Sequence, residues 1–243
     1  MHPITHAQTR PDHPAMIMAG SGQTVTFAEM DAYANRFAQL LRARGLKRGD
    51  HFAVLMENNV HYLQVVWGSQ RAGTMMVPIS TRLTAPEICY ILKDAGAKFL
   101  LTSTRYAEAI EGIRDECANL PLLIVDGEGE EDYEAALAAQ PAEPIADQAP
   151  GQYMLYSSGT TGRPKGVMLA HKNFSEYVLN NVSPVDLEME EKNILTVPMY
   201  HIAGIQAVMA SMYGGRTLVL QRQFDPEEWM SLVQRHSVDR AMM

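Results

Sequence analysis

A loop of small, hydroxylated and cationic residues is the part of the sequence best suited to chemistry. It reads YSSGTTGRPKG from Tyr156 to Gly166. Gly159, Gly162 and Gly166 permit close backbone approach, so successive N–H groups can converge on phosphate oxygens. The serine and threonine hydroxyls add donors, and Lys165 supplies positive charge. The loop therefore predicts a phosphate-binding cradle that directly follows an apolar strand.

The spacing within this loop differs from two common nucleotide-binding motifs. Neither Gly159 nor Gly162 is followed four residues later by an adjacent Gly-Lys-Ser/Thr, and no G-x-G-x-x-G occurs in the chain. The loop is thus neither a Walker motif nor a dinucleotide fingerprint. A phosphotransferase with an atypical loop ranks last among the functions considered.

His201 is a second candidate for chemistry, because it lies between an apolar strand and a helix. Taken alone, a single histidine in that setting is more often structural than functional. The other histidines are interpreted as structural, and His2, His6 and His13 lie in a Pro-rich terminus that we expect to be disordered rather than metal-binding. Cys89 and Cys117 are too few for a disulfide framework and fit a reducing compartment.

Composition and charge limit the classes of partner. The chain has 243 residues with a formal net charge of -8, so nucleic acid is an improbable partner. Residues 127–150 hold seven acidic residues and no lysine or arginine, and they predict a solvated connector with one short helix at 133–139. No signal-peptide-like run or 18-residue apolar stretch occurs, which predicts a cytoplasmic protein without an integral membrane segment.

The elements that must position these residues follow from periodicity and helix caps. Thr26 with Glu29 and Thr84 with Glu87 form capping boxes at two helix starts. Strands are predicted at 51–56, 75–79, 98–102, 122–125, 152–157, 194–197 and 216–220, with a strand beginning at 239–243. Helices are predicted from Phe27 up to Gly45, at 60–72, from the Thr84 cap to about 94, at 104–118, from about 173 onward, at 201–212 and at 226–235. This alternation predicts an α/β fold with mostly parallel sheets flanked by helices.

The sequence resembles a known family at several points in the same order. SSGTTGRPKGV is similar to the signature loop of the AMP-forming, acyl-activating superfamily, which includes acyl-CoA synthetases, peptide-synthetase adenylation domains and luciferases. VTFAEMDAYANRFAQLL and QRAGTMMVPISTRLTAPEICYILKDAGAKFLLTS resemble earlier landmarks of that family, and TVPMYHIAG resembles its substrate-side loop. The matching segments run from about residue 24 to the C-terminus.

The resemblance implies a two-step reaction. A carboxylate attacks the α-phosphate of ATP to give an acyl-adenylate and pyrophosphate, and a thiol such as CoA then displaces AMP. The first step joins two anions, so positioning and charge neutralisation with Mg²⁺ must supply most of the catalysis. By motif position the triphosphate would be held by Ser157, Ser158, Gly159, Thr160, Thr161, Gly162 and Lys165, with Thr161 also at the metal.

The resemblance also assigns the acyl side of the site. His201 would position the substrate and stabilise the adenylate, and His201 and Lys165 would be the two catalytic residues. The acyl pocket would also be lined by Tyr200, Ile202, Ala203 and Gly204. Amino-acid-activating relatives usually place an aspartate after the histidine, whereas this chain has Ile202. An apolar side chain cannot pair an ammonium group, so a fatty or aromatic acid is the favoured substrate.

The resemblance covers only part of a complete family member. Complete members are longer and carry Tyr-Gly-x-Thr-Glu and Thr-Gly-Asp motifs and a late lysine on a mobile domain, none of which occurs here. We therefore expect residues 1–243 to be the N-terminal part of the large adenylation domain, in two packed lobes, with the phosphate loop and acyl pocket in residues 151–243. Such a fragment would turn over little or no substrate by itself.

Three alternatives remain open at this point. The chain could be a truncated, non-enzymatic module that binds phosphate or acyl groups, an amino-acid-activating adenylation domain, or the atypical phosphotransferase. A homo-oligomer is also possible.

Overall fold

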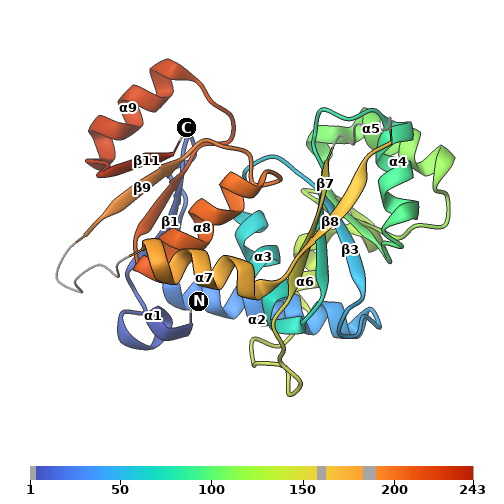
Figure 1. Cartoon of the computed structure of the whole chain (residues 1–243), viewed down its shortest axis with the longest axis horizontal. Helices are drawn as coiled ribbons and strands as arrows, with labels where there is room; N and C mark the ends of the chain where they lie inside the picture. The colour runs from blue at the N-terminus through green and yellow to red at the C-terminus, as the bar shows by residue number, and fades with distance from the viewer. Residues whose placement is uncertain (1–3, 158–162, 183–189, 243) are drawn as a thin grey trace. The chain divides into compact units, whose positions relative to one another are not determined.

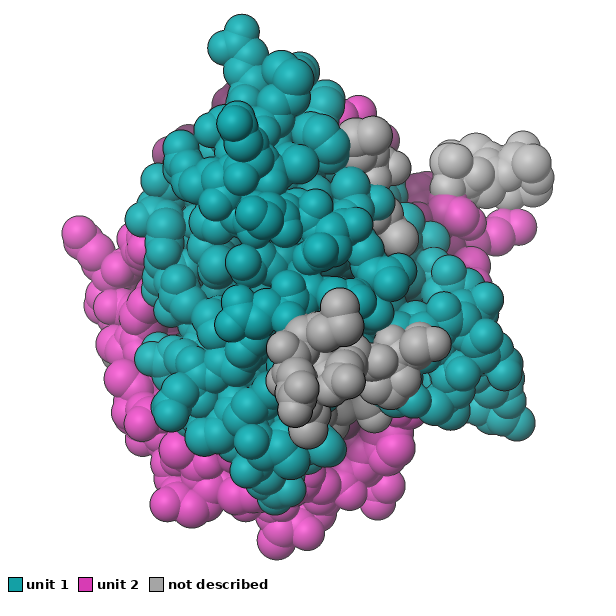
Figure 2. All heavy atoms as spheres, turned by 90° about the vertical axis from the view of Figure 1, so that its left-hand side faces the viewer, with its two compact units in different colours: residues 1–33, 57–67, 172–243 teal, residues 34–56, 68–171 magenta. Residues whose placement is uncertain are grey.

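The computed structural model describes residues 4–157, 163–182 and 190–242, apart from the side chains of residues 130 and 242. The chain divides into two compact units. Unit 1 comprises residues 1–33, 57–67 and 172–243, and unit 2 comprises residues 34–56 and 68–171 (Figure 2). The chain thus crosses between the units several times, which is why neither unit is a continuous segment.

The helices and strands alternate along the chain, as Figure 1 shows. The helices are α1 (Ile4–Thr9), α2 (Phe27–Ala43), α3 (Val60–Ala72), α4 (Ala85–Asp94), α5 (Ala107–Glu116), α6 (Tyr133–Ala138), α7 (His171–Asn181), α8 (Ile202–Gly214) and α9 (Pro226–His236). The strands are β1 (Pro14–Met18), β2 (Thr24–Thr26), β3 (His51–Leu55), β4 (Met75–Pro78), β5 (Leu100–Ser103), β6 (Leu122–Val125), β7 (Gln152–Ser157), β8 (Lys165–Leu169), β9 (Lys192–Leu195), β10 (Thr217–Leu220) and β11 (Arg240–Met242).

Each unit contains one mixed sheet. In the described part of the chain, unit 1 has a five-stranded sheet in the order β11-β9-β10-β1-β2, and unit 2 has a six-stranded sheet in the order β6-β5-β3-β4-β7-β8. All neighbouring strands pair in parallel except β1 with β2 and β7 with β8, which lie at one edge of each sheet. The predicted α/β fold with mostly parallel sheets is confirmed.

Local sequence signals fix several helix starts as predicted. The Thr84 N–H donates to Glu87 Oε2 at 2.8 Å, which caps α4, and the Thr26 N–H donates to Glu29 Oε2 at 2.8 Å before α2. The Asp225 carboxylate accepts the Glu228 N–H at 2.8 Å at the start of α9. These caps satisfy backbone donors that the first helical turn leaves without intrahelical partners.

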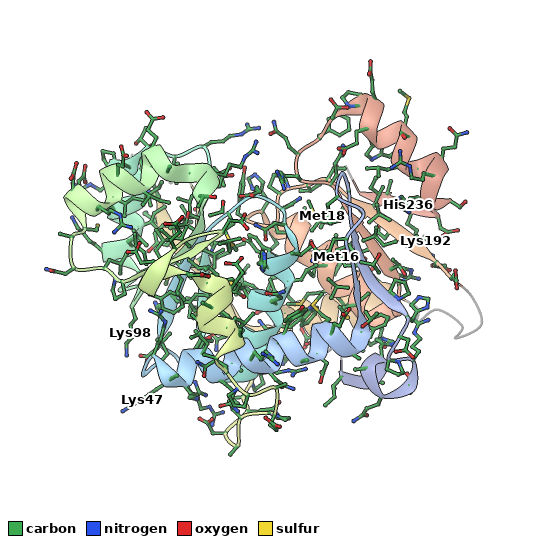
Figure 3. All side chains as sticks on the ribbon, turned by 180° about the vertical axis from the view of Figure 1, so that it is seen from behind. Met16, Met18, Lys47, Lys98, Lys192 and His236 are labelled. Atoms are coloured by element: carbon green, nitrogen blue, oxygen red, sulfur yellow. The ribbon has the colours of Figure 1, made fainter. Side chains whose placement is uncertain are left out.

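One core cluster of unit 2 lies between its sheet and the helices α4 and α5. The buried face of α4 consists of Ile88, Cys89, Ile91 and Leu92, which pack against residues of β3, β4, β5 and β6. In unit 1, Leu232 of α9 packs against Ile194 and Val219 of neighbouring strands. Met16 and Met18 of β1, labelled in Figure 3, are also buried, so these two methionines fill core positions.

From Ile4 onward the N-terminal segment is packed into unit 1, where the sequence predicts disorder, and His2 lies outside the described residues. Residues of β1 pair in parallel with β10, about 200 positions later in the chain. The ring of His13 stacks on Phe27 with centroids 6.0 Å apart, and its Nε2 lies 3.3 Å from Thr217 Oγ1. The sequence pattern missed this because the partner strand is distant and the segment is short and rich in proline.

The acidic segment is also more tightly packed than a solvated connector. Helix α6 forms at the predicted position, but its Tyr133 is fully buried and lies beside the ring of Phe37. Arg42 of α2 pairs with Asp147 at 3.0 Å, which attaches the acidic end of the segment to that helix. The segment therefore belongs to the packed structure of unit 2.

Candidate functional site

The phosphate-loop residues that the structure describes lie at the loop end of a β-hairpin in unit 2. Strands β7 and β8 lie side by side (Figure 1) and are antiparallel. Their register places Ser157 directly opposite Lys165. Both side chains are exposed. The hairpin therefore brings a hydroxyl and an ammonium group, eight residues apart in sequence, to adjacent positions, where they suit an anionic ligand.

Gly166 is closely packed within the same hairpin. A Cβ at this position would lie 3.0 Å from the sulfur of Met154 and 3.2 Å from Cζ of Tyr156, on the facing strand. The glycine thus allows the Tyr156 ring to lie across β8. This explains why one of the loop's glycines follows Lys165 directly.

Helix α4 contacts both ends of the loop. The Tyr156 hydroxyl donates to Asp94 Oδ2 at 2.6 Å, and the Tyr90 hydroxyl donates to the carbonyl of Pro164 at 3.3 Å. The Arg163 guanidinium lies 5.8 Å from the centroid of the Tyr90 ring. Sequence reasoning identified this helix as a family landmark but did not connect it to the loop.

Tyr156 is held as a hydrogen-bond donor. Burial of the phenol, with the neighbouring Asp94 carboxylate as a further cause, raises the pKa of Tyr156 above its usual range. The phenol therefore keeps its proton at neutral pH and continues to donate to Asp94.

Several predicted phosphate ligands lie outside the described residues. These are Ser158, Gly159, Thr160, Thr161 and Gly162, and they include the predicted metal ligand Thr161. Their assignment to ATP and Mg²⁺ stays a prediction.

The predicted acyl-side residues lie in unit 1, at the start of α8. His201 is the N-cap residue; its side chain is exposed and makes no capping hydrogen bond. Tyr200 is buried, and its ring centroid lies 4.6 Å from that of His201. Ile202 is 41% exposed, and Ala203 is partly buried. The arrangement leaves the imidazole available to a ligand, with an apolar side chain beside it.

Gly204, which the family resemblance assigns to the lining of the acyl pocket, lies where two backbone segments approach closely. It is buried, and a Cβ there would clash with the carbonyl oxygen of Pro198 and lie 2.9 Å from Cα of Met199. The first turn of α8 can therefore rest on the backbone that leads to His201. Only glycine allows this approach without displacement.

Asn58 binds the backbone of the loop that precedes His201, and the sequence alone did not identify it. It is 2% exposed, and its amide donates to the carbonyls of Val197 at 3.1 Å and Gln221 at 3.2 Å. Its Oδ1 accepts the Met199 N–H at 2.9 Å. Asn58 thereby fixes the backbone before His201, although no local motif marks it.

The predicted site residues thus fall into two groups, one in each unit. Ser157 and Lys165 are brought together on unit 2, and Tyr200 is brought against His201 on unit 1. Among the described residues, no group of three or more His, Cys, Asp or Glu side chains could hold a metal ion. A helix long and apolar enough to cross a membrane is likewise not found in the described part of the chain.

Comparison with known proteins places these features in a family. The model of the family described as "AMP-binding enzyme" matches residues 4–242. A long-chain-fatty-acid–CoA ligase, FadD13, from Mycobacterium tuberculosis is 34% identical over 93% of this chain and 46% of its own length. A feruloyl-CoA synthase from Amycolatopsis sp. is 32% identical over 97% of this chain and 46% of its own length.

Solved structures give the same relationship. The inhibitor-bound N-terminal domain of FACL13 from Mycobacterium tuberculosis has a TM-score of 0.89 at 31% identity and covers 98% of this chain and 61% of that one. The AMP complex of O-succinylbenzoate coenzyme A synthetase from Bacillus subtilis has a TM-score of 0.79 at 26% identity, covering 98% of this chain and 60% of that one. The chain spans about half the length of the curated relatives it matches.

Proposed function

The chain belongs to the AMP-binding enzyme family, and we propose that the protein carrying it activates a carboxylic acid with ATP and transfers the acyl group to CoA. The observation that carries this proposal is the exposed pair of Ser157 and Lys165 at the loop end of the β7–β8 hairpin. A hydroxyl donor and a cation on adjacent strands suit the phosphates of ATP. The names of the relatives support the same reaction class, because they are acyl-CoA ligases.

Lys165 and Ser157 would act on charge. Adenylation brings a carboxylate toward a polyphosphate, so donors and a fixed cation lower the repulsion between them. Mg²⁺, when bound, would neutralise further phosphate charge, and the residue assigned to it by family resemblance is Thr161. The same resemblance assigns Ser158, Gly159, Thr160 and Gly162 to the triphosphate.

The start of α8 would orient the acid. The exposed His201 imidazole can donate a hydrogen bond to a carboxylate or acyl oxygen, while the buried Tyr200 ring supports it from one side. The exposed apolar side chain of Ile202 favours a fatty or aromatic acid over an amino acid, since an ammonium group beside it would lose hydration without a partner. Ala203 would lie beside the same acyl group.

The experiment is acid-dependent exchange of pyrophosphate into ATP by the whole protein that carries this chain. We expect exchange with long-chain or aryl acids and a reduction of about 100-fold in Lys165→Ala, the order seen when one charge-stabilising donor is removed. Lys172→Ala is the matched control, because Lys172 is 81% exposed on α7 and pairs only with a neighbouring glutamate among the described contacts. Exchange that is independent of any carboxylic acid would refute the proposal.

The isolated 243-residue chain is expected to show no exchange, since it spans about half the length of its relatives. Exchange by the isolated chain at the rate of the whole protein would contradict this part of the proposal.

A further inference from the structure

Helix α4 contacts both ends of the phosphate loop, and the adenylation chemistry assigns it no role. We propose that Tyr90 and Asp94 of α4 are positioning residues that hold Ser157 and Lys165 in place to bind a polyphosphate. This inference rests on the proposed function, because it assigns the loop end of the hairpin to phosphate.

The outgoing strand is attached through Tyr156. Its hydroxyl donates to Asp94 Oδ2 at 2.6 Å, and Tyr156 immediately precedes Ser157. The acceptor is a carboxylate, and hydrogen bonds to ionised groups are stronger than those between neutral groups. The last residue before the loop is thus tied to the C-terminal end of α4.

The returning strand is attached through Tyr90. Its hydroxyl donates to the Pro164 carbonyl at 3.3 Å, one residue before Lys165, and Arg163 lies over its ring. Arg163 and Pro164 precede the first paired residue of β8, so the sheet ladder does not fix them. Tyr90 supplies a constraint at the point where the ladder ends.

Both attachments come from one rigid element. Tyr90 and Asp94 are four residues apart, which places them on the same side of α4. The opposite side of the helix is buried in the core of unit 2, and a capping box fixes its first turn. The rings of Tyr90 and Tyr156 also pack against that core. The helix can therefore act as a fixed reference for two loop ends that are distant in sequence.

Two physical effects of Asp94 on anion binding have opposite signs, which makes the proposal testable. As a negative charge near the loop, Asp94 should weaken anion binding, so Asp94→Asn would tighten it if charge were all that mattered. As the charged acceptor for Tyr156, Asp94 should strengthen binding, so the same substitution, which leaves only a neutral amide oxygen to accept the hydrogen bond, would weaken it.

The experiment is titration calorimetry of the 243-residue protein with inorganic tripolyphosphate. We expect Tyr156→Phe and Tyr90→Phe each to weaken binding by about fivefold, the loss for one partly exposed hydrogen bond, and Asp94→Asn, which keeps a neutral acceptor, to weaken it less. Asp94→Asn combined with Tyr156→Phe should cost little more than Tyr156→Phe alone, because both changes act on the same hydrogen bond. Asp94→Glu should restore part of the affinity. Asp115→Asn, on the exposed side of α5, is the matched control and should leave affinity unchanged.

The outcomes separate the assignment of the loop to phosphate from the positioning role of Tyr90 and Asp94. Wild-type protein that binds no tripolyphosphate would overturn the phosphate assignment and this inference with it. Wild-type binding with unchanged or tighter binding in Asp94→Asn and Tyr156→Phe would overturn the inference alone. Melting temperatures of all variants are recorded, and if Asp94→Asn fails to fold, the two phenylalanine variants carry the test.

Discussion

Asn58 offers the sharpest test of how unit 1 positions His201. Its side chain makes three hydrogen bonds to backbone groups that come from two segments more than 130 residues away. Replacement by alanine removes all three and leaves the buried Met199 N–H without this acceptor. We expect the backbone before His201 to lose its fixed position.

The size of the effect follows from the contacts. Each hydrogen bond contributes about 1 kcal/mol net, and a buried donor left unsatisfied costs about 1 to 3 kcal/mol more. Asn58→Ala should therefore lower the free energy of unfolding by about 4 to 6 kcal/mol, a large share of the stability of an ordinary domain. Asn58→Asp should cost about as much, because a carboxylate cannot donate to the two carbonyls and would face them as a buried charge.

The assay is urea unfolding at neutral pH, with Asn59→Asp as the control. The Asn59 Oδ1 accepts the Tyr62 N–H at 3.0 Å at the start of α3, and aspartate can accept the same bond at a helix N-terminus. We expect a loss below about 1 kcal/mol for that control. A loss below 1 kcal/mol in both Asn58 variants would refute the reasoning.

Two further predictions concern unit 1. Gly204→Ala should lower the free energy of unfolding by about 1 to 3 kcal/mol, because the new methyl group overpacks against the backbone of Pro198. The higher helix propensity of alanine offsets about 1 kcal/mol of this loss. Urea unfolding measures the change, and a stabilised variant would contradict the prediction. The second concerns acid. The hydrogen bond from Arg216 Nε to Glu191 Oε2, at 2.7 Å, lowers the pKa of Glu191 below its ordinary value of 4.5. The stabilisation that the Glu191 carboxylate contributes is then fully present above the ordinary pKa of 4.5, and it is lost as the pH falls through the pKa of Glu191 in the folded state. The stability difference between wild type and Glu191→Gln should shrink between pH 6 and pH 3, and a difference independent of pH would rule this out.

Local signals predicted the elements that carry their own caps and periodicity. Helix α3 spans the predicted residues 60–72, and β7 spans the predicted 152–157, because apolar patterning and flanking turn residues define both. The capping boxes at Thr26 and Thr84 form as expected. The edges of other elements shift by a few residues, as α5 does when a short 3-10 turn replaces its first residues.

Contacts between distant segments could not be predicted in the same way. β1 is short and is defined by its pairing with β10, and Tyr133 is buried by a helix about 100 residues earlier. The same limit applies to the candidate site. Lys165 and His201 stand in recognisable motifs, whereas Asn58 and Asp94 gain their roles only from partners that folding brings near.

The nucleotide product formed from ATP tests the central claim most directly. The whole protein that carries this chain, given ATP, Mg²⁺, CoA and a fatty or aryl acid, should release AMP in a one-to-one ratio with the acyl thioester, and Lys165→Ala should abolish most of that release. Formation of ADP in place of AMP would contradict the account, because it would assign the loop to phosphoryl transfer instead of adenylation.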